Sequence, residues 1–208
     1  MLITRIEQIK KELYRIEIDY EFAFALYTRE MKKLHLKEEC EIQEEVVEMI
    51  EKDIVLPRAK RKAMMLLQRS DRTREELRKR LLEASFSLNI VDKTLEYIDS
   101  YGYINDERYM ENYVFFKKGN KSKKQIEMEL IKKGLDRQQV TQYLEENEWD
   151  ETKVLRELVE KRLSKKANLD EKELQKQYGY FMRKGYAYYT VKRIIDAYLE
   201  EIETEQNL

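Results

Sequence analysis

The side chains best suited to chemistry are basic ones at helical spacing near the middle of the chain. Arg74, Arg78 and Lys79 fall on one predicted helix. Residues three or four apart share a helix face, so such a helix can present several cations to one anionic surface. The candidate contacts to a protein or DNA partner are Arg74, Arg78, Lys79, Lys117, Lys118, Lys121, Lys123, Lys124, Lys132 and Lys133.

The alternative interpretation of these cations is a solvated helix surface. Carboxylates that could balance them lie nearby, at Glu75, Glu76, Glu127 and Glu129. The net charge of the chain is −1, yet basic residues outnumber acidic ones over residues 58–137, and the reverse holds before and after. This regional excess favours an anionic partner over a merely solvated surface.

Catalytic chemistry finds little support. His35 is the single histidine, and Cys40, the single cysteine, is the one soft ligand near it. The sequence contains neither the GxxxxGK[ST] phosphate loop nor the GxSxG nucleophile motif. Carboxylates alternate with lysines as on solvated helices. We therefore predict no enzyme activity, no cofactor and no metal site.

Composition indicates a mainly α-helical soluble protein. Charged residues make up 40% of the 208 residues, with five Gly and one Pro. No apolar run is long enough to span a membrane, and no signal peptide pattern opens the chain. The lone cysteine cannot form an internal disulfide, which favours a reducing compartment. We expect a cytoplasmic monomer without membrane contact.

A pattern with a period of about 50 residues fixes the elements that position the cations. Thr73 and Ser122 are equivalent helix caps, each followed three residues later by Glu or Gln, as in a capping box. Ser85, Gly134 and Gly185 are equivalent helix-closing residues, for which we expect a left-handed backbone. One apolar series aligns with another: Leu77, Leu81, Phe86, Val91 and Leu95 with Ile126, Leu130, Leu135, Val140 and Leu144.

The N-terminal segment has a different pattern: apolar and charged residues alternate over 14–18, and large apolar residues alternate with alanine over 22–26. Alternation is typical of half-buried strands, so we expect a small antiparallel sheet with a further strand within 2–9. Pro57 marks the predicted change to helical repeats. The predicted domains are an N-terminal module at 1–57, three-helix repeats at 58–104, 105–149 and 150–200, and an acidic tail at 201–208.

Aromatic residues cluster around the second repeat. We expect Tyr109 and Tyr113 to pack in the core, because Val154 and Leu158 occupy the equivalent positions. The same packing role, rather than base stacking, is predicted for Tyr101, Tyr103, Phe115 and Phe116, whereas Tyr188 and Tyr189 should be exposed.

Four stretches of this sequence resemble the RecX family of regulatory proteins: Arg74–Leu82, Tyr101–Tyr109, Lys124–Leu135 and Arg183–Tyr186 followed by Val191. Their order and spacing carry the resemblance, which covers nearly the whole chain. Departures are Tyr20 and Ser85, which stand where glycine is usual, and Cys40, which lies in a loop that often carries glycine.

The resemblance implies tandem three-helix repeats forming an elongated curved rod, with a small β-containing N-terminal module. It also implies a partner, the RecA recombinase filament, with weak non-specific DNA contact. Such proteins lie in the helical groove of the RecA–DNA filament and inhibit strand exchange, ATP hydrolysis and stimulated repressor self-cleavage. They thereby modulate DNA repair, recombination and the SOS response.

A second hypothesis from a different class remains open: a helical DNA-binding module acting as a repressor or architectural factor. The affinity for free duplex DNA separates the two hypotheses. A filament regulator with nearly zero net charge should bind bare DNA weakly.

Overall fold

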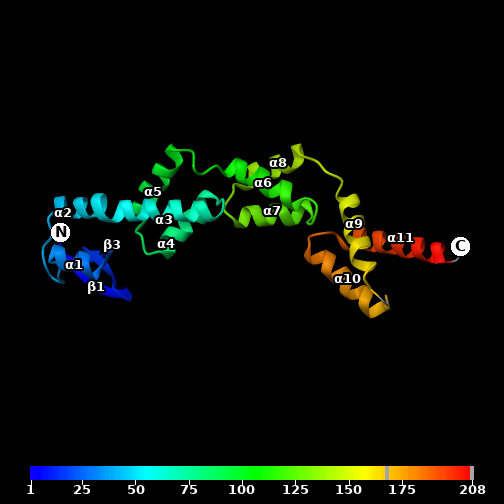
Figure 1. Cartoon of the computed structure of the whole chain (residues 1–208), viewed down its shortest axis with the longest axis horizontal. Coiled ribbons are helices and arrows are strands. Elements are labelled where there is room, and N and C mark those ends of the chain that lie inside the picture. The colour runs from blue at the N-terminus through cyan, green and yellow to red at the C-terminus, as the bar shows by residue number, and fades with distance from the viewer. Residues whose placement is uncertain (167–168, 207–208) are drawn as a thin grey trace. The chain divides into compact units, whose positions relative to one another are not determined.

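The computed structural model describes residues 1–166 and 169–206 (Figure 1). The chain forms two compact units, Met1–Asp106 and Glu107–Leu208. It is mainly helical, with one small antiparallel sheet at the N-terminus. This confirms the predicted class of three-helix repeats preceded by a β-containing module. Two residues of the predicted acidic tail, 207 and 208, lie outside the described residues.

The sheet consists of β1 (Ile3–Lys10), β2 (Leu13–Ile18) and β3 (Glu21–Tyr27), in that order and antiparallel. In β2, Ile16 and Ile18 are buried whereas Arg15 and Glu17 are only partly buried, which agrees with the predicted strand period over these residues. The β2–β3 turn places Asp19 and Tyr20 at φ of 49° and 68°, as a tight two-residue hairpin turn requires. Tyr20 thus adopts the backbone conformation that glycine would adopt more easily.

The helical backbone continues through Pro57 without interruption. After α1 (Thr28–Leu34), a continuous helical run comprises α2 (Glu44–Met49), a π-helical turn (Ile50–Val55) and α3 (Leu56–Arg69). In the π-helical turn, the Leu56 N–H donates to the Glu51 carbonyl, five residues back. This wider turn accommodates the proline ring, which would clash in a regular helix interior.

The sheet and the first repeat share one hydrophobic core. The repeat consists of α3, α4 (Arg74–Glu83) and α5 (Leu88–Ser100), which contact one another. Phe24 of β3, Ala63 of α3 and Leu81 of α4 are all fully buried in this core. The sheet and the first repeat therefore have no separate cores that a boundary at residue 57 could divide. The domain ranges predicted from the sequence remain a proposal.

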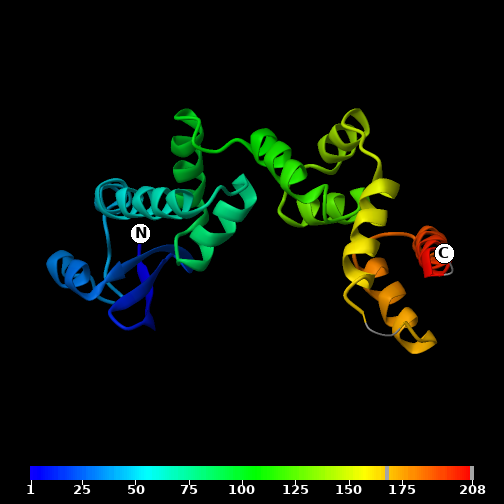
Figure 2. The same ribbon diagram turned by 45° about the vertical axis from the view of Figure 1, so that its right-hand side comes forward.

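The second unit contains two hydrophobic core clusters. They belong to two successive groups of helices, drawn in green and in yellow to red in Figure 2. Ile126 and Val140 centre the first cluster, built from α6 (Asp106–Lys117), α7 (Lys123–Lys132) and α8 (Arg137–Glu146). Phe181 and Ile195 centre the second, built from α9 (Glu151–Leu163), α10 (Glu171–Arg183) and α11 (Tyr188–Gln206). Each cluster corresponds to one predicted three-helix repeat.

The helix-closing residues confirm the alignment of the repeats. Ser85, Gly134 and Gly185 have φ values of 67°, 92° and 86°, all in the left-handed region. Within the described residues, no helix is long and apolar enough to cross a membrane. The described residues also contain no cluster of His, Cys, Asp or Glu that could hold a metal ion.

Candidate functional site

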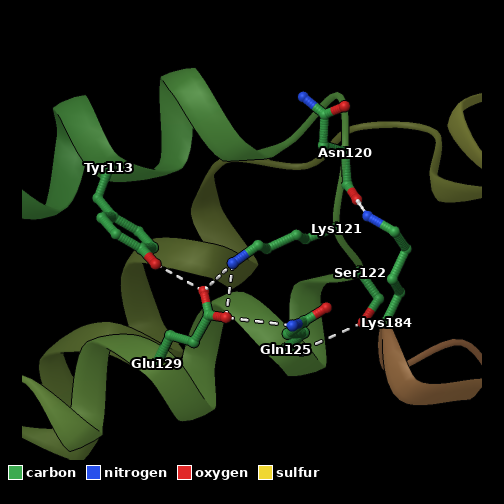
Figure 3. Close-up of polar contacts among 7 residues, drawn as sticks. All are labelled: Tyr113, Asn120, Lys121, Ser122, Gln125, Glu129 and Lys184. Carbon is green, nitrogen blue, oxygen red and sulfur yellow. Dashed lines mark hydrogen bonds and ion pairs between the residues drawn. The ribbon is translucent and has the colours of Figure 1, made fainter.

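The N-terminus of α7 docks against the corner between α10 and α11, inside the second unit (Figure 3). The Ser122 N–H donates to the Lys184 carbonyl at 3.3 Å, and Lys184 Nζ donates to the Asn120 carbonyl at 2.9 Å. A Cβ at Gly185 would lie 2.2 Å from Ser122 Oγ, so only glycine allows this approach. The corner is therefore a fixed joint between the second and third repeats.

Only one of the two hydrogen bonds of the predicted capping box at Ser122 is formed. Ser122 Oγ accepts the Gln125 N–H at 3.1 Å, as expected. The reciprocal bond is replaced, because the Ser122 N–H binds Lys184 and Gln125 Nε2 donates to Glu129 Oε1 at 3.1 Å. In the first repeat the box is complete, since Thr73 and Glu76 exchange both bonds.

At this joint, the Glu129 carboxylate accepts hydrogen bonds from neighbouring polar side chains. Tyr113 Oη donates to its carboxylate at 2.6 Å, and Lys121 Nζ contacts both of its oxygens at 2.6 Å (Figure 3). Burial tends to raise the pKa of the Glu129 carboxyl, but the hydrogen bonds from Lys121 and Tyr113 outweigh it, so the pKa lies below its ordinary value. Lys121, a predicted partner contact, therefore has a structural role.

A groove of about 550 Å³ opens beside this joint, between α7 and the α10–α11 corner. Met128, Met182 and Tyr188 line it and are exposed by 63%, 48% and 47%. Three further lining residues are cations without an ion pair among the described residues: Lys124, Lys132 and Arg183. We refer to these six residues as the cationic groove.

The buried Tyr186 adds an unused hydrogen-bonding group to the lining of the cationic groove. Its side chain is 7% exposed, and its hydroxyl has no hydrogen-bond partner in the described part of the chain. Burial, together with the nearby Glu151 carboxylate, raises the pKa of Tyr186 to about 12. The hydroxyl stays protonated at neutral pH, and an unsatisfied buried donor favours an incoming acceptor.

In the first unit, two predicted contact residues hold the repeat together. The Arg74 guanidinium pairs with Asp99, and Arg78 Nη1 lies 2.6 Å from Asp92 Oδ1. Both carboxylates belong to α5, so these pairs tie α4 to α5. Lys79 is exposed and makes no ion pair in the described structure.

In the second unit, the remaining predicted residues are three lysines near aromatic rings, two lysines that line the groove, and Lys117, which belongs to neither group. Lys118, Lys123 and Lys133 have their ammonium groups 5.1–5.6 Å from the ring centroids of Phe115, Trp149, and Tyr109 and Tyr113. Lys117 is partly exposed. Lys124 and Lys132 alone among the predicted residues line the cationic groove.

Sequence reasoning misjudged some residues. The packing role is confirmed for Tyr109 and Tyr113. It is wrong for Phe115 and Phe116, which are 66% and 69% exposed, and for Tyr101 and Tyr103, which are 60% and 47% exposed. The positions of Phe115 and Phe116 at the end of α6 fall beyond the core stripe of that helix. It also missed Met128 and Met182, because an exposed methionine on an amphipathic helix looks like a core residue in sequence.

The basic residues near the end of α9 were missed for another reason. Lys161, Arg162, Lys165 and Lys166 follow one another at helical spacing. The net acidity of residues 138–208 concealed this local cluster. A charge count over a window of one helix, rather than one region, would have found it.

Comparisons with known proteins agree with this architecture. Residues 59–97 match the family model of the first three-helix domain of RecX, and residues 150–195 match that of the third. Two solved structures share the fold. A regulatory protein RecX has a TM-score of 0.56 at 22% identity, covering 94% of this chain and 98% of that one. RecX from Lactobacillus salivarius has a TM-score of 0.53 at 21% identity, covering 68% and 95%.

Curated relatives extend over almost the full chain. Regulatory protein RecX of Clostridioides difficile (strain 630) is 29% identical over 206 residues, which is 95% of this chain and 96% of that protein. Regulatory protein RecX of Clostridium acetobutylicum is 28% identical over 219 residues, covering 99% and 98%. These relatives are named regulatory proteins rather than enzymes. The repeats, the matched three-helix domains and these relatives together show that the chain belongs to the RecX family.

Proposed function

We propose that this protein binds the RecA–DNA filament in its helical groove and inhibits the recombinase, ATPase and coprotease activities of the filament. Membership of the RecX family supports a regulatory role in DNA repair and recombination. The chain acts by binding, and the partner carries the catalytic chemistry.

The observation that carries this proposal is the cationic groove. Exposed Met128 and Met182 offer a flexible apolar surface, which suits a protein side chain better than a nucleic-acid backbone. Lys124, Lys132 and Arg183 border that surface and make no ion pair among the described residues, whereas Glu129, a carboxylate of the same lining, is already paired with Lys121. The groove therefore fits an apolar residue flanked by carboxylates on the surface of a recombinase subunit.

Inhibition follows from occupancy of the filament. A chain of repeats offers contacts along its length, which suits binding to more than one subunit of a polymer. A protein held in the groove of the filament occupies space that a second DNA or a repressor needs.

Co-sedimentation with RecA filaments assembled on single-stranded DNA tests the proposal. The groove variant is Lys124→Glu with Lys132→Glu. Its control is Lys153→Glu with Lys172→Glu, two exposed lysines of the same unit outside the groove. We expect the groove variant to bind at least about 10-fold more weakly and the control within about 2-fold of the native chain. Equal binding by both variants would contradict the role of the groove.

The second candidate function, a helical DNA-binding module, predicts a different result. Such a module should bind free duplex DNA tightly without any recombinase. The net charge of −1 and the ion pairs of Arg74 and Arg78 favour weak duplex binding instead. A duplex affinity in the nanomolar range at physiological salt would favour the DNA-binding module.

A further inference from the structure

A second recess of the second unit is surrounded by positive charge. It has a volume of about 360 Å³ and lies between the C-terminal half of α9, the end of α10 and the loop before α7. Its lining contains no carboxylate and five cations: Lys161, Arg162, Lys165, Lys166 and Lys184. Recesses lined by charge of one sign concentrate the field and attract ions of the opposite sign. We call this recess the basic pocket.

Arg162 is held in place at the basic pocket. Its Nε donates to Gln177 Oε1 at 2.5 Å, and its guanidinium carbon lies 3.6 Å from the Tyr180 ring centroid. Gln177 is itself 2% exposed and donates to Glu173 at 2.6 Å. The terminal nitrogens of Arg162 have no partner among the described residues. A fixed guanidinium with two free terminal nitrogens matches two oxygens of a phosphate.

Three of the four lysines add positive charge that no carboxylate of the described residues neutralises. Lys161 lies in the last turn of α9 and Lys165 in the turn that follows the helix; both are exposed and make no ion pair within the described residues. Lys184 is fixed to the Asn120 carbonyl, which is uncharged. Only Lys166 of the five pairs with a carboxylate, with Nζ 2.8 Å from Glu173 Oε1. An anion in the basic pocket would therefore meet a largely unbalanced set of cations.

We propose that the basic pocket binds the phosphodiester backbone of single-stranded nucleic acid. The volume of about 360 Å³ is large enough to admit a phosphate with its sugar. The Tyr180 ring is covered by Arg162, so base stacking is not available there and binding should be independent of base sequence. A flexible single strand can bend a phosphate into a recess, whereas the phosphates of duplex DNA lie on a stiff cylinder.

This inference rests on the proposed function in one respect, because a filament regulator encounters DNA that is held as a single strand. The pocket itself needs no recombinase. It is separate from the cationic groove, since the two share no lining residue. The two surfaces assign different partners to one unit: the groove to protein and the pocket to phosphate.

Fluorescence anisotropy with a labelled oligothymidylate, in the absence of recombinase, tests the proposal. The pocket variant is Lys161→Gln with Lys165→Gln. The control is Lys153→Gln with Lys172→Gln, which removes the same charge from two exposed lysines of the same unit that make no ion pair with any described residue. We expect at least about 10-fold weaker binding by the pocket variant at low salt and less than about 2-fold weaker binding by the control. The slope of log affinity against log salt should fall by about 1.4 for two lost contacts to a single strand.

The Arg162→Lys variant tests whether the paired terminal nitrogens of the guanidinium are needed, because lysine keeps the positive charge but lacks these two donors. We expect it to weaken binding while leaving the circular dichroism spectrum and the melting temperature close to native values. Equal losses in the pocket and control variants, or no loss in either, would overturn the proposal. So would equally tight, pocket-dependent binding of polyglutamate or of duplex DNA. Because no recombinase is present, failure here leaves the filament proposal standing.

Discussion

At the scale of single residues, the backbone conformation of Ser85 is the clearest departure from the pattern of the repeats. Ser85 has φ of 67°, where the equivalent residues are Gly134 and Gly185. A residue with a Cβ is strained by roughly 1–2 kcal/mol in this conformation. Glycine would remove the strain but adds entropy to the unfolded chain.

We therefore expect Ser85→Gly to stabilise the first unit by about 1 kcal/mol or less, measured by urea denaturation. Gly134→Ala, the reverse change at the equivalent position, should destabilise the second unit. If Ser85→Gly lowers the unfolding free energy and Gly134→Ala leaves it unchanged, these positions do not close helices in the way described.

Gly185 and Gly102 form a matched pair for a second prediction. Both have positive φ, 86° and 65°, but a Cβ at Gly102 would meet no atom within 4 Å. At Gly185 the Cβ would lie 3.1 Å from the Gln125 backbone nitrogen, in addition to its clash with Ser122. Gly102→Ala should cost about 1 kcal/mol from backbone strain alone.

Gly185→Ala should cost at least about 2 kcal/mol more than Gly102→Ala, because α7 must move away from the α10–α11 corner. Urea denaturation of both variants gives the comparison. Similar costs at the two positions would show that the close approach at Gly185 contributes little to stability.

The left-handed residues were predictable because helix-closing geometry depends on a few neighbouring residues. The partners of Arg74 and Arg78 were not, since Asp99 and Asp92 lie on another helix whose rotation the sequence does not specify. The proximity of Lys161 and Lys184 was likewise not predictable from the sequence. They line one pocket only because the chain returns between α9 and α10.

At the scale of elements, equivalent acids close the N-termini of equivalent helices. The Arg74 N–H, at the start of α4, donates to Asp106 Oδ1 at 2.9 Å. The Lys123 N–H, at the start of α7, donates to Glu151 Oε1 at 2.6 Å. Each acid stabilises free N–H groups and the positive end of the helix dipole. The periodicity predicted the helices, but not these bonds between residues distant in sequence.

The Glu173 carboxyl of α10 predicts how the stability of the folded chain depends on pH. Hydrogen bonds from Lys166 and Lys176, together with that from Gln177, lower the pKa of the Glu173 carboxyl from 4.5 to about 2. A carboxyl with a lowered pKa in the folded state stabilises that state fully above its unfolded pKa. The stabilisation is lost as the pH falls from about 4.5 to about 2.

Glu173→Gln should therefore lower the melting temperature at neutral pH and make it less dependent on pH below about 4.5. Glu171→Gln, an exposed change in the first turn of the same helix, is the control and should retain the native pH dependence. Identical acid profiles for the native chain and Glu173→Gln would show that these hydrogen bonds do not persist in solution.

At the scale of the whole molecule, each unit contains its own hydrophobic core. The core of Met1–Asp106 extends from the sheet to α5, and the two clusters of the other unit lie within Glu107–Leu208. We expect fragments 1–106 and 107–208 each to fold with a cooperative thermal transition. A fragment 1–106 without a cooperative transition would contradict the independence of its core.

The overall class was predictable at this scale, because period-2 and helical patterns separate clearly at the N-terminus. The shared core of the sheet and α3 was not predictable, since Pro57 is a typical boundary residue and the π-helical turn that accommodates it has no sequence signature. The cationic groove and the basic pocket likewise arise from repeat packing rather than from any one segment.

The rate of ATP hydrolysis by RecA on single-stranded DNA, titrated with this protein, tests the central claim most directly. We expect the native chain and the Lys153→Glu, Lys172→Glu control to lower the rate at similar concentrations. The Lys124→Glu, Lys132→Glu variant should need at least about 10-fold more protein for the same inhibition. An unchanged ATPase rate at saturating native protein, or equal inhibition by the groove variant and the control, would contradict the account.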